Sequence, residues 1–327
     1  MHSSAPVTKQ KQKKSGMNTM GFLEEYRVSL IFIVLCIIAG MLSDAFFTVN
    51  NIMNVLRQVS IIAIIASGMT LVILIAGIDL SVGAVMAFSG AILAGVLTAG
   101  LSLPVALLAA IGVGLLFGIF NGFVVAKFGV PSFIATLSTM VIARGMTLVY
   151  TKGYPLVVSN EPFRFIGSGR VFGIPVPIII MFVVFGLMYS MLKYTSFGRY
   201  IYAIGGNEET AVLAGINVKF IKVAVFGIAG MLSALSAVIY TSRLMSAQPT
   251  AGSGIELDAI AAVIIGGTSL AGGKGGVIGT LIGALIMGVL DNVLNLMNVS
   301  PFYQSIAKGL VILVAVLVDS KFSKVKK

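Results

Sequence analysis

The sequence predicts an all-α protein, a polytopic membrane bundle of about ten transmembrane helices, and three observations support this prediction. Of the 327 residues, 58% are apolar and only 10% carry a formal charge, whereas about 25% are charged in an average soluble domain. The apolar residues are gathered into long runs, and a helix that spans a bilayer needs about 20 of them in succession. Lys and Arg punctuate these runs, which is typical of membrane topology signals. A soluble globule is therefore excluded.

Ten apolar runs follow a polar N-terminal stretch. Residues 1–20 contain four lysines among polar residues and show no cleavage site, so we expect a basic cytoplasmic tail and no cleaved signal peptide. The runs fall at 28–47, 59–77, 82–100, 103–127, 130–150, 176–194, 219–242, 259–272, 275–298 and 302–320. The eighth run is short, which favours a broken or re-entrant helix. We expect the membrane domain over 21–321 and a second basic cytoplasmic tail over 322–327.

The basic residues orient these spans. With the N-terminus in the cytoplasm, five of the 22 Lys and Arg residues fall outside, two lie within spans, and the other 15 fall on the cytoplasmic side. This excess places both termini in the cytoplasm, as expected for a multi-pass protein of a bacterial inner membrane. The external charges are Arg57, Lys152, Arg164, Arg170 and Arg243, with Asp44, Glu161, Glu256 and Asp258. The net charge of +11 thus indicates topology, and we expect no nucleic-acid partner.

The composition excludes most catalytic chemistry. The one cysteine, Cys36, lies in an apolar run, and the one histidine, His2, lies in the polar tail. The chain therefore has no intrachain disulfide, thiolate metal cluster or His-based acid–base catalysis. The glycine-rich segment 266–276 fails the spacing of a phosphate loop, because Lys274 is followed by Gly275 where Ser or Thr is needed. We expect no cofactor, and the energy of a nucleotide would have to come from another polypeptide.

Two segments of the chain resemble each other. Residues 77–90 align without gaps to 254–267, and five of the 14 positions are identical. The first copy falls at a predicted cytoplasmic turn and the second at an external one, as an inverted-topology repeat requires. Because Gly, Ile, Leu and Ala dominate this composition, chance also accounts for the match, and both interpretations stay open.

The most informative polar segment is 195–219, on the predicted cytoplasmic side. Asn207 is a good N-cap, and Glu208 and Glu209 complement the positive end of a helix dipole. Gly215 favours the left-handed conformation that ends a helix. These residues predict a two-turn helix over 208–214, which is too short to be stable alone in water. It needs a partner surface, either a second protein or the underside of its own bundle.

Four strings in the sequence carry a resemblance to a known family. They are GMTLVILIAGIDLSVGA (68–84), GRYIYAIGGNEETAVLAGINV (198–218), SAQPTAGSGIELDAIAAVIIGGTSLAGGKGG (246–276) and AVLVDSK (315–321). Over about residues 22–321 the chain resembles the permeases of the monosaccharide branch of ABC importers, and most closely those for ribose. Permeases for galactosides, xylose and furanone-type signals share these strings in looser form, so they are the alternatives for the cargo.

The resemblance implies a type II ABC importer fold and a set of partners. These are a second permease copy in a homodimer, two ATPase subunits or one tandem ATPase, and an extracytoplasmic binding protein that delivers the sugar. It also implies that 205–216 is the coupling helix received by a groove on the ATPase. The coupling residues are then Gly205, Gly206, Asn207, Glu208, Glu209, Ala211, Ala214, Gly215 and Ile216. We expect Ala211 and Ala214 to face that groove, because small side chains allow close packing.

Polar and charged residues inside the spans are candidates for the translocation path. Asp291 and Lys308 lie about seven and six residues from the external ends of the last two spans, or roughly 10 Å deep. Their matching depth predicts an ion pair, with a polar vestibule lining as the alternative; Arg144 lies at a similar depth without a visible partner. The best path candidates are Asn292, Asn295, Thr268 and Asn121.

Two external arginines are candidates for docking the binding protein. Arg57 and Arg243 are expected in short external loops, where they would dock carboxylates of the binding protein.

Two other function classes fit the sequence less well. An ion-coupled secondary transporter needs carboxylates near the midplane, and Asp291 is the one that lies well inside a predicted span. An intramembrane enzyme needs a nucleophile and base pair, and the sequence offers no clear one.

Overall fold

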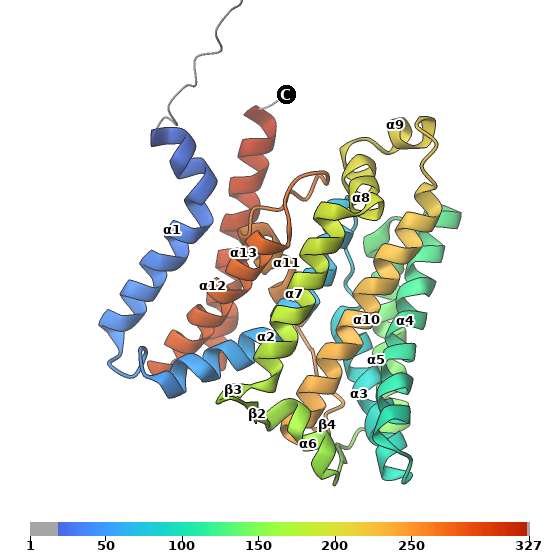
Figure 1. The fold of residues 1–327 in the computed structure, drawn as a ribbon, viewed down its shortest axis with the longest axis vertical. Helices are drawn as coiled ribbons and strands as arrows, with labels where there is room; N and C mark the ends of the chain where they lie inside the picture. Colours follow the sequence, from blue (N-terminus) through green and yellow to red (C-terminus); the bar gives the residue numbers. More distant parts are fainter. Residues whose placement is uncertain (1–18, 326–327) are drawn as a thin grey trace, which may run out of the picture.

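A computed structural model of the chain shows helices that run roughly side by side along the long axis of the molecule (Figure 1). It describes residues 19–325. The predicted tails, 1–20 and 322–327, therefore lie outside the described residues, apart from the start of the first helix and the end of the last. Within the described part there are thirteen helices and four strands of two residues each. The prediction of a helical membrane bundle is confirmed, with two small strand pairs added.

The elements follow one another with short connections. In chain order they are α1 (Thr19–Leu42), α2 (Val49–Leu74), α3 (Val82–Thr98), α4 (Leu103–Phe128), α5 (Ser132–Thr151), β1 (Leu156–Val157), α6 (Glu161–Ser168), β2 (Arg170–Val171), β3 (Ile174–Pro175), α7 (Val176–Tyr194), α8 (Ser196–Gly206), α9 (Glu208–Leu213), α10 (Val218–Leu244), β4 (Ser246–Ala247), α11 (Ile255–Ile265), α12 (Val277–Leu296) and α13 (Pro301–Val325). The strands pair antiparallel, β1 with β4 and β2 with β3.

Six of the described helices are long and apolar enough to cross a membrane, namely α2, α4, α5, α7, α10 and α12. Shorter apolar stretches lie in α1, α3 and α13. With 11 residues, α11 is only about 16 Å long, roughly half of the hydrocarbon core. The eighth run, expected to be broken, therefore contains a half-helix. The count of ten spans and the inverted repeat stay predictions.

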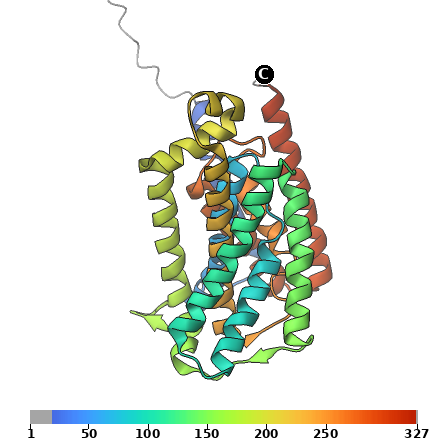
Figure 2. The ribbon, with the colours of Figure 1, turned by 90° about the vertical axis from the view of Figure 1, so that its right-hand side faces the viewer.

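The bundle has two distinct ends. One is covered by α8 and α9, and we call it the α8–α9 end; the other carries α6 and the β2–β3 pair, and we call it the α6 end (Figure 1, Figure 2). The start of α1 and the end of α13 both lie toward the α8–α9 end (Figure 1). The described chain therefore crosses the bundle an even number of times.

The centre of the bundle is built on α2 and α10. From Val59 to Leu74, α2 is apolar on nearly all sides, and all but one of these residues are buried, as expected for a helix surrounded by others. It packs against α7, α10, α11 and α12, whereas α10 packs mainly against α2, α3 and α4. The outward faces of α1, α4 and α13 carry exposed apolar side chains, which suits a bilayer.

A stripe of glycines lets α4 and α10 approach closely. Gly114, Gly118 and Gly122 repeat every four residues and so share one face of α4. A Cβ atom added at Gly118 would collide with the carbonyl oxygen of Phe226, and one at Gly114 would collide with that of Gly230. Small residues play this role where no hydrophobic force drives helices together. Glycine at every fourth position of an apolar run predicts close helix packing, and the contacts of Gly114 and Gly118 confirm it.

This packing predicts that Gly118→Leu lowers the yield of folded protein several-fold, because the two helix backbones would have to separate. Gly112→Leu is the matched control, since a Cβ atom there meets no atom within 4 Å. Size-exclusion chromatography of fluorescently tagged protein in detergent measures both yields. Equal yields of the two variants would contradict the packing argument.

Candidate transport and coupling sites

The polar segment predicted over 195–219 forms α8 and α9 across one end of the bundle (Figure 2). The side chain of Asn207 accepts a hydrogen bond from the Thr210 backbone N–H at 2.7 Å and so caps α9. Gly215 has a φ of +81° where the chain turns toward α10. The predicted N-cap and the predicted stop are confirmed, and α9 ends at Leu213, one residue earlier than expected.

The two faces of α9 differ in exposure. Ala211 is only 3% exposed, so it packs inward; the expectation that it faces a partner's groove is wrong, although Ala214 is exposed. Val212 is 56% and Leu213 88% exposed. Apolar side chains that stand this far out of a short polar segment are typical of an interaction surface.

The position of α9 is fixed from its own chain. The Lys222 ammonium of α10 lies 2.7 Å from Glu208 Oε1 at the start of α9. Glu209 and Gly206 are exposed, and Gly205 and Ile216 are partly buried. Of the predicted coupling residues, the structure therefore brings some to the surface and uses others to hold the segment in place.

The coupling segment touches the loops that follow α2 and precede α12. A Cβ atom at Gly205 would collide with the Leu74 carbonyl oxygen and the Gly273 N–H, and that N–H donates to Leu74 O at 2.9 Å. The Tyr202 hydroxyl donates to Gly275 O at 2.8 Å. Burial raises the pKa of Tyr202, which keeps its hydroxyl a donor. The segment 266–276 is thus packed tightly against α8.

Between α2 and α3 the chain is extended and carries a buried carboxylate. Asp79 is 1% exposed, and its Oδ1 accepts from the Ser81 hydroxyl at 2.6 Å. Asn121 Nδ2 donates to Ser81 Oγ at 2.9 Å, and Asn121 Oδ1 accepts from Thr139 at 2.6 Å. Asn121, a path candidate, is therefore an internal link between α3, α4 and α5. The sequence predicts a turn at this segment, and a Ser two residues after an Asp is the signal of this local bonding.

The other three path candidates also bond within the chain. Asn292 exchanges two side-chain hydrogen bonds with Asn51, at 2.9 and 2.8 Å, and so joins α12 to α2. Asn295 accepts from Gln304 at 2.9 Å. Thr268 is 1% exposed within the loop before α12. The four candidates come from α4, α12 and the loop before α12, and the structure does not bring them to one surface.

Two cavities lie elsewhere on the described surface. One of about 450 Å³ at the α8–α9 end is lined by residues that include Lys193, Tyr202 and Gly276. The other, of about 510 Å³, lies between α2 and α7 and has apolar walls that include Leu56 and Phe182. None of the four path candidates lines either cavity.

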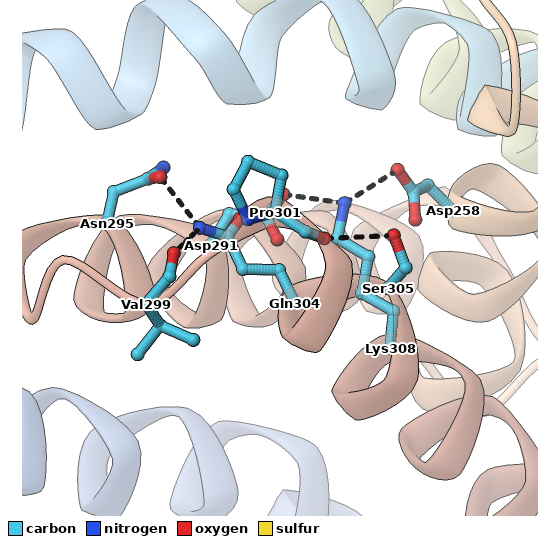
Figure 3. Close-up of polar contacts among 8 residues, drawn as sticks. All are labelled: Asp258, Asp291, Asn295, Val299, Pro301, Gln304, Ser305 and Lys308. Atoms are coloured by element: carbon cyan, nitrogen blue, oxygen red, sulfur yellow. Dashed lines mark hydrogen bonds and ion pairs between the residues drawn. The ribbon is translucent and has the colours of Figure 1, made fainter.

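The predicted partners Asp291 and Lys308 meet, and a third residue joins them (Figure 3). Lys308 Nζ lies 2.9 Å from Asp291 Oδ2 and 3.1 Å from Asp258 Oδ2. Lys308 of α13 thus contacts both α12 and α11. The expectation of an external loop for Asp258 is wrong, because this residue lies in the first turn of α11. Asp291 Oδ1 is buried without a hydrogen-bond partner in the described part of the chain.

Arg144 has partners that the sequence could not reveal. Its Nη1 donates to the carbonyl oxygens of Pro249 and Ala251, both at 2.9 Å, and the opposite charge of Glu256 acts on it. Glu256, also expected in an external loop, lies instead in the first turn of α11. Because the acceptors are main-chain carbonyls, no side-chain pattern predicts this contact. Arg144 therefore anchors the non-helical stretch between β4 and α11 to α5.

A basic cluster lies at the α6 end. Arg57 is part of α2, which starts ten residues before the predicted run, and Arg243 is in the last turn of α10. The expectation that both lie in short loops is wrong, because counting apolar residues overlooks polar first and last turns. The like charges of Arg243 and Arg170 act on Arg57, so both arginines lie near Arg57. Arg57 Nε is buried without a hydrogen-bond partner among the described residues.

Comparison with known proteins gives one family and several relatives. The family model described as "Branched-chain amino acid transport system / permease component" matches residues 51–316. The chain is 54% identical to the ribose import permease protein RbsC of Haemophilus influenzae, over 95% of this chain and 97% of the relative. It is 50% identical to RbsC of Bacillus subtilis (93% and 95%), and 39% identical to the D-allose transport system permease protein AlsC of Escherichia coli (97% and 98%). No solved structure gives a significant match.

The charge cluster predicts unequal costs for its members. Lys308→Met leaves two carboxylates without a cation, which approaches the roughly 3–5 kcal/mol of a broken buried pair. Asp291→Asn costs less, because Lys308 keeps Asp258. We expect the double variant Lys308→Met/Asp291→Asn to recover part of the loss of Lys308→Met.

Thermal unfolding midpoints of the purified variants measure these costs. Arg164→Gln, which breaks an exposed pair with Glu161 at 3.6 Å, is the control and should change little. Additive losses in the double variant would contradict coupling within the cluster.

Proposed function

The chain belongs to the family of branched-chain amino acid transport system permease components, and we propose that it is the membrane permease of an ATP-driven ribose importer. It is a multi-pass inner membrane protein and a transport subunit. The observation that carries the cargo proposal is the 50–54% identity to ribose import permeases from two bacteria over nearly the whole chain. The relative named for D-allose is more distant, at 39%.

The proposed assembly has two copies of this chain, two ATPase subunits or a tandem ATPase, and an extracytoplasmic binding protein. In it each chain crosses the bilayer ten times in a type II arrangement, with the α8–α9 end in the cytoplasm. The common end for the start of α1 and the end of α13 supports this orientation (Figure 1), as does the excess of basic residues on that side.

We propose that α9 couples the permease to the ATPase. The exposed apolar pair Val212 and Leu213 suits insertion into a groove, and the bond between Glu208 and Lys222 fixes the angle of α9. A displacement of α9 would be transmitted through α8 to the loop 266–276, because the Tyr202 hydroxyl of α8 donates a hydrogen bond to this loop. From there it would reach α11 and α12, which the loop connects.

We propose that the basic cluster at the α6 end receives carboxylates of the binding protein. Arg57, Arg170 and Arg243 come from three elements, and they lie close together despite their like charges. Such an arrangement favours an anionic partner, and charged contacts of this kind mainly speed and orient association.

An ion-coupled transporter is the alternative mechanism. The buried carboxylate of Asp79 is an observation in its favour, because intramembrane acids often mark ion pathways. Against it, Asp79 accepts two hydrogen bonds from Ser81, and Asp291 has a lysine partner. Both acids therefore have structural roles within the chain.

Uptake of labelled sugars into proteoliposomes tests the proposed function. We expect ribose uptake that requires the ATPase, ATP and the binding protein together, with weaker uptake of allose, xylose and galactosides. Uptake driven by an ion gradient without ATP would overturn the ABC mechanism, and stronger uptake of another sugar would overturn ribose as the cargo.

The exposure of α9 predicts that Leu213→Ser reduces ATP-driven uptake at least about fivefold, a loss of roughly 1 kcal/mol of docking free energy. The buried Ala211 predicts a different defect, because Ala211→Leu would displace α9 from the bundle. Leu101→Ser, at an exposed apolar position near the α6 end, is the control. Binding of the ATPase to permease in nanodiscs measures the effect, and equal binding by Leu213→Ser and the control would contradict this role.

The basic cluster predicts a salt-sensitive defect. We expect Arg57→Gln and Arg243→Gln to slow association of the binding protein at low ionic strength, and we expect the difference from wild type to shrink at high salt. Arg164→Gln, whose arginine pairs with Glu161, is the control. The association rate of the binding protein is measured on permease in immobilised nanodiscs. If both variants bind at the wild-type rate at low salt, the cluster does not dock the partner.

A further inference from the structure

The stretch between β4 and α11 crosses about half of the bundle without helical structure. β4 pairs with β1 near the α6 end, and Gly252 packs against the backbone of Gly83 in the first turn of α3. After β4 the chain folds into turns, because the N–H of Ala251 donates to Gln248 O and the N–H of Ser253 donates to Thr250 O. The loop that follows α11 lies at the α8–α9 end, where Tyr202 bonds it, and α11 covers about 16 Å from there. This length is about half of the roughly 30 Å of a hydrocarbon core, which places the start of α11, and with it Gly252, near mid-depth.

One side of this stretch is open at the surface of the chain. Thr250, Ser253 and Gly254 are exposed, and Leu257 in the first turn of α11 is 51% exposed. The neighbouring elements are α5, through Arg144, and α13, through Lys308. The open side is therefore a polar strip between α5 and α13.

Hydrogen-bonding capacity is left unused on this strip. The Ser253 hydroxyl donates to Thr250 O at 2.9 Å and keeps its own lone pairs free. The Thr250 hydroxyl makes no hydrogen bond to any residue that the structure describes. A hydroxyl both donates and accepts, which is also true of every hydroxyl of a sugar.

The bilayer limits what such a strip can face. Irregular backbone at membrane depth is tolerated only where protein buries it or where it lines a water-filled cavity. The extended stretch 77–81 before α3 meets the first condition, because Gly77, Asp79 and Ser81 are buried. The strip from Thr250 to Leu257 does not meet it within one chain.

We propose that the open side of residues 250–257 lines the translocation path, with the hydroxyls of Thr250 and Ser253 as the groups that exchange hydrogen bonds with the passing sugar. This inference rests on the proposed function and names the lining of its path. It replaces Asn121, Thr268, Asn292 and Asn295, whose polar groups are engaged within the chain. Two hydroxyls without an aromatic stacking surface bind a sugar weakly, as a path that must release its cargo requires.

Accessibility of engineered thiols in the assembled transporter tests the proposal. The native Cys36 is first replaced by Ala, and Thr250→Cys or Ser253→Cys is then introduced. A charged, membrane-impermeant methanethiosulfonate reagent is present on both sides of the proteoliposome, so access does not depend on which side the path is open. Because the reactive species is the thiolate, which needs water, we expect both positions to react at least about tenfold faster than thiols that face lipid.

The matched controls lie on exposed apolar faces of other helices. Val34→Cys on α1 is at a position 54% exposed, and Leu116→Cys on α4 is at one 68% exposed. Rates at 250 and 253 equal to those of both controls would overturn the proposal, whether lipid or a second copy covers the strip. Ribose uptake by the Cys36→Ala background is measured in parallel; its absence would count against the proposed function, whereas normal uptake with unreactive thiols would count against the path lining alone.

A second readout separates a path role from a folding defect. Thr250→Val keeps the shape and removes the hydroxyl, and we expect it to lower ribose uptake at least about fivefold, as loss of a hydrogen bond does. Thr250→Ser should retain more than about half of the uptake, because the hydroxyl remains. Equal uptake by Thr250→Val and wild type, at equal amounts of protein in the membrane, would exclude the hydroxyl from the path.

Discussion

Backbone groups inside a bilayer have to be hydrogen-bonded, and the structure depends on how two non-helical stretches meet that requirement. In the first stretch, the N–H of Ile78 donates to Ser132 Oγ at 3.0 Å, and the N–H of Leu80 donates to Thr136 Oγ1 at 3.1 Å. In the second, Arg144 donates to two carbonyl oxygens. Side chains thus replace the missing helical hydrogen bonds.

The three side chains that make these hydrogen bonds lie on one helix, α5. Ser132, Thr136 and Arg144 are separated by four and eight residues, so they share one face of α5. The second stretch also touches the first turn of α3, which directly follows the first stretch, where Gly252 meets Gly83. A displacement of either stretch therefore strains the same helix and the same contact. The coupling segment contacts the neighbours of both stretches, because Gly205 packs against Leu74 and Gly273. Leu74 lies just before the first stretch, and Gly273 lies in the loop after α11.

Sequence reasoning succeeded where the determinant is local. The N-cap at Asn207, the positive φ of Gly215 and the close packing along Gly114 and Gly118 follow from the chemistry of a few neighbouring residues, and the structure has all of them. The meeting of Asp291 with Lys308 followed from helical rise alone, because both lie at the same depth on antiparallel helices.

Sequence reasoning failed where main-chain groups or helix ends decide the outcome. Arg144 bonds carbonyl oxygens, which carry no sequence signature, so its partners were invisible. Asp258 was assigned to an external loop because the first turn of α11 carries two acids, as a polar loop does. Asn121 was assigned to the path because an amide in a span looks available, although Ser81 and Thr139 use it. Arg144 and Asn121 are thus hydrogen-bonded to groups within or beside the non-helical stretches.

The same demand explains why charges surround the proposed path without lining it. Arg144 binds carbonyl oxygens of the stretch between β4 and α11, and Lys308 holds Asp258 and Asp291 together. These contacts fix both ends of the strip 250–257 with charges that are already engaged. The acid within the strip, Glu256, is partly buried and interacts with Arg144. The exposed polar groups of the strip are uncharged hydroxyls and peptide groups. Hydroxyls and peptide groups can replace the hydrogen bonds that a neutral sugar makes with water. An ion on this strip would lose its hydration without gaining a countercharge. A strip whose charged groups are engaged within the chain therefore favours passage of a polyol over leakage of ions.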